Sequence, residues 1–284
     1  MSEQFSIRPS PIAGKWYPSN PDRLADTVDT YIQQAKNPPI EGQIAAVVVP
    51  HAGHIYSGPV AGYAFAALRG LSPELICVIS PMHYAYPQPI LSTAHQAYST
   101  PLGDVIVDHQ ILDLLNERLK NSIGIEIHLI SRDPEHSLEI ELPFLQRTFP
   151  NGFKLLPIMV RDQSEPLMKA LGLALAETIR DQDTLLVAST DLSHFYPQET
   201  ANKLDAYFLS QLADFNPSGV LQAEIEGRGY ACGRGAVAVV LWAAKQLGAD
   251  QVKILNHATS GDVSGDYDQV VGYGSAVIIR RLPE

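Results

Sequence analysis

Short apolar runs alternate with amphipathic segments along this chain, and the alternation predicts its fold class. The runs are rich in β-branched residues, as is typical of strands covered on both faces, and they lie at Ile44–Pro50, Leu75–Ile79, Lys154–Val160, Thr184–Ala188, Val252–Asn256 and Gly274–Ile279. Apolar residues at helical spacing mark the segments between them, which are Pro21–Ala35, Pro59–Leu68, Asp108–Leu119, Ser137–Phe149, Glu165–Ile179, Glu199–Asp214, Gly219–Glu224 and Cys232–Gln246. This order predicts an α/β fold with a mostly parallel, mixed central sheet and helices on both faces.

Three of the predicted strands end in a polar turn that carries a histidine. His51 follows the first apolar run in the turn HAGHIYSG, His83 follows the second in SPMH, and His194 follows the fourth in STDLSH. Ligands of open α/β sheets bind at the carboxyl ends of the strands. Imidazole is also the commonest metal ligand of proteins. The pattern therefore predicts a shared pocket at this edge of the sheet.

The turn after the first strand holds a second histidine, His54, and a tyrosine, Tyr56. His51 and His54 are three residues apart, so they would share a face on a helical turn and diverge in an extended segment. We expect only His51 to bind a metal, with His54 and Tyr56 lining the pocket.

The segment ASTDLSH places Asp191 three residues before His194. On one turn of helix, this carboxylate would orient the imidazole and raise its basicity, or the pair would act in proton transfer. The alternative is that Ser189, Thr190 or Asp191 caps a short helix.

The segment EHSLEIELPFL places His136 and Glu139 at the start of a predicted helix. Both are candidates for the pocket wall, and helix capping is the alternative. Cys232, in GYACGRGAV, opens another predicted helix, where the helix dipole and Arg234 would favour a thiolate. A thiolate binds soft or borderline metals or attacks an electrophile, whereas the alternative is a buried structural cysteine.

Composition narrows the class of protein. The 284 residues carry a net charge of −11, which argues against binding to nucleic acid or to an anionic membrane surface. The chain has no run of about 18 apolar residues and no apolar signal sequence. Its two cysteines, Cys77 and Cys232, fit a reducing compartment, so we expect a cytoplasmic protein. No linker or repeat divides the chain, and we expect one domain over residues 1–284.

Taken together, these blocks resemble the Memo-like family, also called AmmeMemoRadiSam system protein B. The resemblance runs from about Arg8 to Ile279 and is carried by AGKWYP, VVVPHAGHIYSG, SPMH, EHSLEIELPFLQ, STDLSH, CGRGAV and VGYGSAVI. It implies a fold similar to class III, non-haem-iron extradiol dioxygenases, and a copper or iron ion held by two histidines and a cysteine. Matched motif by motif, the implied metal ligands are His51, His83 and Cys232. Asp191 and His194 match the D-x-x-H pattern that lines the same pocket.

Two departures from related patterns bear on the activity. His83 is followed by Tyr84, where the family often has a second histidine. Cys232 stands where the dioxygenases use a glutamate, and thiolate ligands suit copper(I) or zinc better than a hard oxygen site does. The family name also implies a functional link to an AMMECR-type protein and a radical-SAM protein. Animal members are linked to signalling and to phosphotyrosine-peptide binding.

Three hypotheses follow from the sequence. The first is a metal-dependent redox enzyme with iron or copper, or alternatively zinc, at His51, His83 and Cys232. In the second, the cleft of a non-catalytic module binds a peptide or small acid through imidazoles and the aromatic residues Trp16, Tyr56 and Tyr84. The third is a metal-free hydrolase or transferase with Cys232 as nucleophile and His194 as base.

Overall fold

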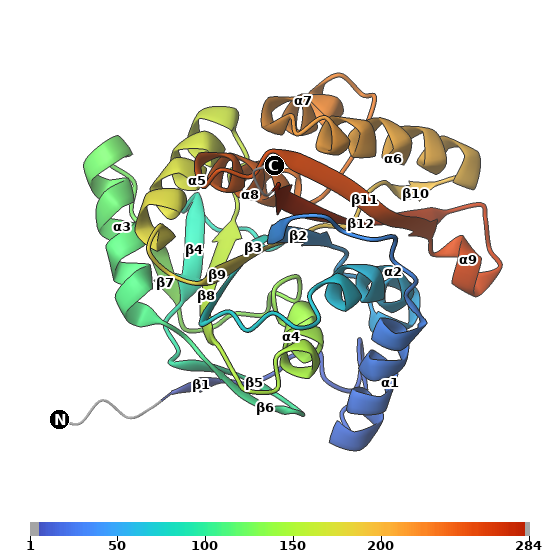
Figure 1. The fold of residues 1–284 in the computed structure, drawn as a ribbon, viewed down its shortest axis with the longest axis horizontal. Helices are drawn as coiled ribbons and strands as arrows, with labels where there is room; N and C mark the ends of the chain where they lie inside the picture. Colours follow the sequence, from blue (N-terminus) through green and yellow to red (C-terminus); the bar gives the residue numbers. More distant parts are fainter. Residues whose placement is uncertain (1–5, 282–284) are drawn as a thin grey trace.

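The computed structural model describes residues 6–281 and has a mixed sheet at its centre (Figure 1). Within these residues the sheet has nine strands in the order β10-β12-β2-β9-β3-β8-β4-β7, and β11 pairs with β12. Their bounds are β2 Gln43–Val49, β3 Leu75–Pro81, β4 Ile90–Thr93, β7 His128–Ile130, β8 Lys154–Val160, β9 Thr184–Ser189, β10 His194–Tyr196, β11 Gln251–Thr259 and β12 Val270–Arg280.

The middle of the sheet is parallel and the edges are mixed. Strand β9 pairs in parallel with both β2 and β3, and β3 pairs in parallel with β8. Strand β12 is antiparallel to β2, β10 and β11, and β4 is antiparallel to β8. The carboxyl ends of β2, β9 and β3 therefore lie at one edge of the sheet, as the predicted site requires.

Helices cover both faces of the sheet, which confirms the predicted α/β class. Alternate strand residues point to opposite faces. Thus Ala46 and Val48 belong to the apolar core that includes residues of α3, α5, α6, α7 and α8, whereas Val47 and Val49 belong to the core that includes residues of α1, α2 and α4. The helices are α1 Pro21–Gln34, α2 His54–Ala67, α3 His109–Ile123, α4 Leu142–Thr148, α5 Glu165–Ile179, α6 Gln198–Ala213, α7 Pro217–Ile225, α8 Arg234–Gln246 and the short α9 Gly261–Ser264.

A separate three-stranded sheet anchors the N-terminal arm (Figure 1). It has the order β1-β5-β6, with β1 Ile7–Arg8, β5 Ala97–Thr100 and β6 Gly103–Ile106. Strands β5 and β6 form an antiparallel pair before α3. Strand β1 pairs in parallel with β5, so the start of the described chain lies close to residues around position 97.

The structure departs from the predicted helices at three places near the site. Helix α2 starts at His54, ahead of Pro59, and the carbonyl of Trp16 accepts the hydrogen bond from the His54 N–H at 2.9 Å. The predicted helix at 137–149 is a 3₁₀ turn, Glu139–Glu141, followed by α4. The third place is 191–194, where the chain forms no helical turn. Residues 191–193 are irregular, and the chain enters β10 at His194.

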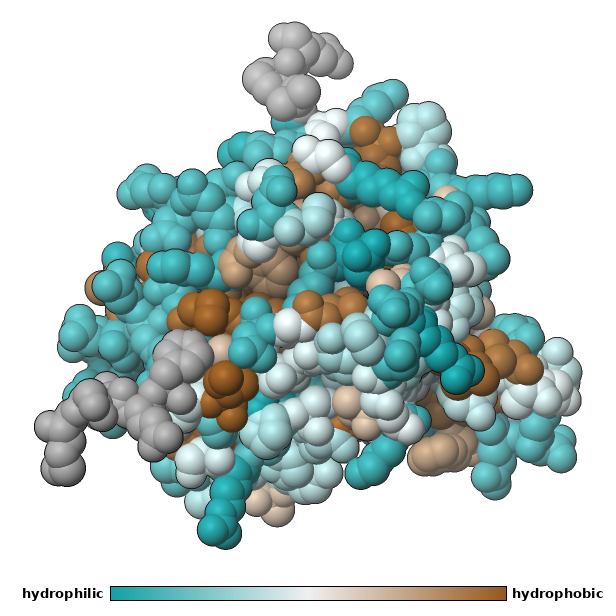
Figure 2. All heavy atoms as spheres, turned by 90° about the horizontal axis from the view of Figure 1, so that it is seen from below, coloured by the Kyte–Doolittle hydropathy of each residue, from teal (hydrophilic) through white to brown (hydrophobic). Residues whose placement is uncertain are grey.

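The surface seen from below is mostly hydrophilic, and its apolar residues gather in small separate groups (Figure 2). Scattered apolar residues of this kind are normal on a folded surface. Within residues 6–281, no helix has the length and apolar character needed to cross a membrane.

Candidate metal centre

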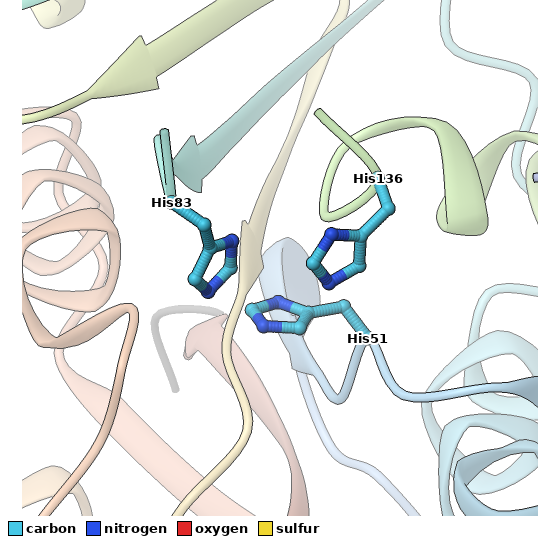
Figure 3. Close-up of side chains that lie close together, drawn as sticks. All are labelled: His51, His83 and His136. Carbon is cyan, nitrogen blue, oxygen red and sulfur yellow. The ribbon is translucent and has the colours of Figure 1, made fainter. Parts of the chain in front are cut away.

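Three imidazoles converge at the carboxyl edge of the parallel strands (Figure 3). His51 follows β2, His83 follows β3, and His136 lies in the irregular segment before the 3₁₀ turn. One ring nitrogen of each residue lies within 4.8 Å of those of the other two. Their exposure increases from buried His51 through partly buried His136 to exposed His83, so the group opens to solvent on one side.

The ring of His51 is held so that its Nε2 atom faces the site. Its Nδ1 lies 2.9 Å from Ser189 Oγ, and that hydroxyl donates to the Ser137 carbonyl at 2.6 Å. The Ser189 oxygen therefore accepts the Nδ1 proton, which leaves Nε2 with a free lone pair. Burial, together with nearby His136, His83 and His194, lowers the pKa of His51. His51 is thus neutral at physiological pH, as a metal ligand must be.

The sulfur of Cys232 completes this side of the site. Cys232 Sγ lies 3.1 Å from His51 Nε2 and comes from the loop that leads into α8. The loop packs tightly on the end of β9, since a Cβ on Gly233 would lie 2.3 Å from the carbonyl oxygen of Ser189. Only glycine permits this approach.

The structure corrects the predicted activation of Cys232. Helix α8 begins at Arg234, capped by Gly233, and Arg234 forms an ion pair with Glu224. Burial and the charge of Asp191 raise the pKa of Cys232. Without a metal ion, Cys232 is therefore a protonated thiol at neutral pH, and a metal ion would displace the proton when it binds.

The predicted pair of Asp191 and His194 is wrong as a hydrogen-bonded pair. Asp191 Oδ1 instead accepts the backbone N–H of His51 at 2.7 Å. His194 begins β10, and its Nδ1 has no hydrogen-bond partner among residues 6–281. Residues 191–193 have no helical structure, so the geometry that a three-residue spacing assumes is not formed. Asp191 thus orients the turn that carries His51, not the ring of His194.

The pKa of Asp191 follows from its burial. Burial raises it to about 7, although hydrogen bonds from the backbone of His51 and Ala52 act in the opposite direction. His194 lies near enough to lower the pKa of His51, and its ring contacts the rings of Phe195 and Tyr230. His194 therefore borders the site.

Two residues predicted for the pocket wall lie outside the converging group. His54 Nε2 bonds to the Ile140 carbonyl at 3.0 Å, and the His54 ring packs between Tyr17 and Phe144. The Glu139 carboxylate accepts hydrogen bonds in a buried network whose donors are Arg8, Ser10 and Tyr17. Tyr56 and Tyr84 are exposed, and Trp16 lies against His136 with ring centroids 4.2 Å apart.

Sequence reasoning missed Glu135, which binds both His83 and His136. The buried Glu135 carboxylate accepts the backbone N–H and the Nδ1–H of His83 at 2.6 and 2.9 Å. It also accepts the backbone N–H groups of His136 and Ser137, each at 2.9 Å. Burial alone would raise the pKa of Glu135, but the bonds from His83, with His136 and Ser137, lower it to about 2. Its one sequence signal is its place directly before His136.

The fold and this group of converging histidines define an α/β protein with a candidate metal centre at the carboxyl edge of its sheet. The family model described as Memo-like protein matches residues 8–277, and the chain belongs to this family. A MEMO1 family protein of Nitrosopumilus maritimus is 36% identical over 277 residues, covering 96% of this chain and 100% of that one. A MEMO1 family protein of Thermotoga neapolitana is 37% identical over 284 residues, covering 96% and 99%.

Among solved structures, an uncharacterized protein of Escherichia coli K12, JW3007, aligns with a TM-score of 0.45 at 15% identity. The alignment covers 82% of this chain and 99% of that one.

Proposed function

We propose that this protein binds a transition metal ion through His51, His83 and Cys232, with His136 as a further donor facing the same space. The observation that carries the proposal is the convergence of three imidazole nitrogens with a cysteine sulfur 3.1 Å from His51 Nε2. Mixed nitrogen and sulfur donors suit iron, copper or zinc better than magnesium or calcium.

The two histidine ligands fit a metal ion in their protonation as well as in their placement. The Nδ1 atoms of His51 and His83 bond to Ser189 and Glu135, so their Nε2 atoms are unprotonated. Hydrogen bonds to Ser189 and Glu135 hold these two rings in place, which lowers the ordering cost of binding.

We propose a redox enzyme as the finer function, because a bound iron or copper ion supplies one-electron chemistry that the side chains lack. The residues around the ion have separate tasks. Asp191 holds the backbone of His51, and His194 stands at the border of the site as a proton-transfer group. Its free, buried Nδ1 supports that role.

The metal-free alternative with Cys232 as nucleophile has weaker support. The nearest base to its sulfur is His51, at 3.1 Å, instead of the predicted His194. Because burial raises the pKa of Cys232, the thiolate that such a nucleophile needs is disfavoured. The peptide-binding module, the links to AMMECR-type and radical-SAM proteins, and the cytoplasmic location stay predictions.

Anaerobic titration with iron(II), copper(I) and zinc(II) tests the metal site. Loss of a residue that only orients a metal ligand typically lowers the affinity about 10–100-fold. We expect His51→Ala and Cys232→Ser, which each remove a ligand, to lower the affinity for the metal by more than this. His128→Ala is the matched control, because His128 is exposed on β7 and lies outside the group of converging imidazoles, and it should leave the affinity unchanged. Wild-type affinity in both His51→Ala and Cys232→Ser would contradict the proposal, whereas a loss in His136→Ala would add His136 to the ligands.

A further inference from the structure

Glu135 joins the two loops that carry the outer imidazoles of the site. One loop follows β3 and carries His83, and the other precedes the 3₁₀ turn and carries His136. The Glu135 side chain is 1% exposed, and its two oxygens accept four hydrogen bonds from these loops. This number matches the capacity of an ionised carboxylate. A residue needed only to pack would not require four directed bonds.

Contacts with the Glu135 carboxylate favour a proton on one particular nitrogen of each ring. An ionised carboxylate only accepts, so His83 Nδ1, 2.9 Å from Glu135 Oε1, must be the protonated nitrogen. His136 Nδ1 lies 3.2 Å from the same oxygen, so the negative charge of the carboxylate attracts a proton on this nitrogen and repels a lone pair there. In a neutral ring, a proton on Nδ1 leaves the Nε2 lone pair free. Both rings, stacked with centroids 4.8 Å apart, thereby keep Nδ1 beside Glu135 and leave Nε2 for the site.

The position of Glu135 is in turn set by the N-terminal arm. Arg8 Nη2 donates to the Glu135 carbonyl at 2.6 Å, and Arg8 Nε donates to Asp133 Oδ2 at 2.5 Å. Asp133 Oδ1 accepts the Glu135 N–H at 2.9 Å. The backbone of Glu135 is therefore held on both sides, and its carboxylate meets the two imidazoles in one orientation.

We propose that Glu135 is a positioning residue that fixes His83 and His136 in the Nδ1–H tautomer and aims both Nε2 atoms at one metal ion. This inference rests on the proposed metal function. Hydrogen bonds of this kind orient a ligand and raise its basicity. Glu135 itself does not contact the ion.

The test is the tautomer of each ring, read from imidazole ¹⁵N shifts of the metal-free protein at pH 8, where ordinary histidines are neutral. His83→Ala and His136→Ala assign the signals. We expect the Nδ1–H form for both rings in the wild type. In Glu135→Gln, whose amide has one acceptor oxygen and one donor nitrogen in place of two acceptors, we expect His83 to shift toward the Nε2–H form. The affinity for zinc(II) should fall about 10–100-fold.

Glu139→Gln is the matched control, because Glu139 is equally buried in the same segment and bonds to Arg8, Ser10 and Tyr17 instead of the imidazoles. It should leave both tautomers unchanged, even where it lowers the thermal midpoint. A wild-type His83 in the Nε2–H form, or the same tautomers in Glu135→Gln as in the wild type, would overturn the inference. Absence of zinc binding by the wild type would overturn the proposed function, and the tautomers would still decide the role of Glu135.

Discussion

Replacement of Arg8 by methionine should lower the free energy of unfolding by about 3–5 kcal/mol, the usual cost when one partner of a buried ion pair is removed. Arg8 is 1% exposed and pairs with Asp133 and Glu139, which are 1% and 0% exposed. Methionine fills much of the volume but leaves both carboxylates buried without their cation. Urea unfolding at pH 7.5 measures the change, with the slope m as a check on two-state behaviour.

Two variants show whether the loss comes from charge. Arg118→Met removes an exposed ion pair with Glu177 and should cost at most about 1 kcal/mol. Adding Asp133→Asn and Glu139→Gln to Arg8→Met removes the uncompensated charges and should recover a large part of the stability. A loss below about 1 kcal/mol in Arg8→Met, or no recovery in the triple variant, would contradict this explanation.

Acidification should destabilise the protein through His54, whose pKa burial lowers to about 4. The unfolded chain takes up this proton near the ordinary value of 6.5, whereas the folded chain resists it down to about 4. The stability that His54 contributes is therefore fully present above pH 6.5 and is lost as the pH falls toward 4. The difference between the two pKa values corresponds to about 3 kcal/mol.

His54→Gln isolates this contribution, because a glutamine amide can still donate to the Ile140 carbonyl but does not titrate. We expect urea unfolding of the wild type to weaken between pH 7.5 and 4.5 by about 2–3 kcal/mol more than unfolding of the variant. The buried site histidines titrate in both proteins, so their effect cancels in the comparison. His128→Gln, on the surface, should follow the wild type. Equal pH dependence in wild type and His54→Gln would show that His54 is not the group responsible.

Much of the fold could be predicted because local pattern and tertiary structure agree. The unbroken apolar runs form buried strands, and parallel pairing of β2, β9 and β3 brings His51 and His83 to one edge. The strand order could not be predicted in this way. Strand β12 lies antiparallel between β2 and β10, a pairing between distant segments that their periodicity does not encode.

The parts of the site that sequence reasoning missed depend on long-range contacts. His136, predicted for the pocket wall, joins His51 and His83 because Glu135 and Arg8 hold an irregular loop, and no local period marks this role of Glu135. The predicted pair of Asp191 and His194 was wrong because it relied on a local spacing. Its three-residue spacing assumed a helix, but the buried Asp191 carboxylate satisfies the backbone N–H of His51 instead.

X-ray absorption of the zinc-loaded protein tests the central claim, that His51, His83 and Cys232 bind one metal ion, most directly. The account predicts nitrogen at about 2.0–2.1 Å and one sulfur at about 2.3 Å from zinc in the wild type. The sulfur should disappear in Cys232→Ser and persist in Cys77→Ala, since Cys77 is buried in the core. A wild-type spectrum without sulfur, or zinc binding that survives His51→Ala unchanged, would contradict the account.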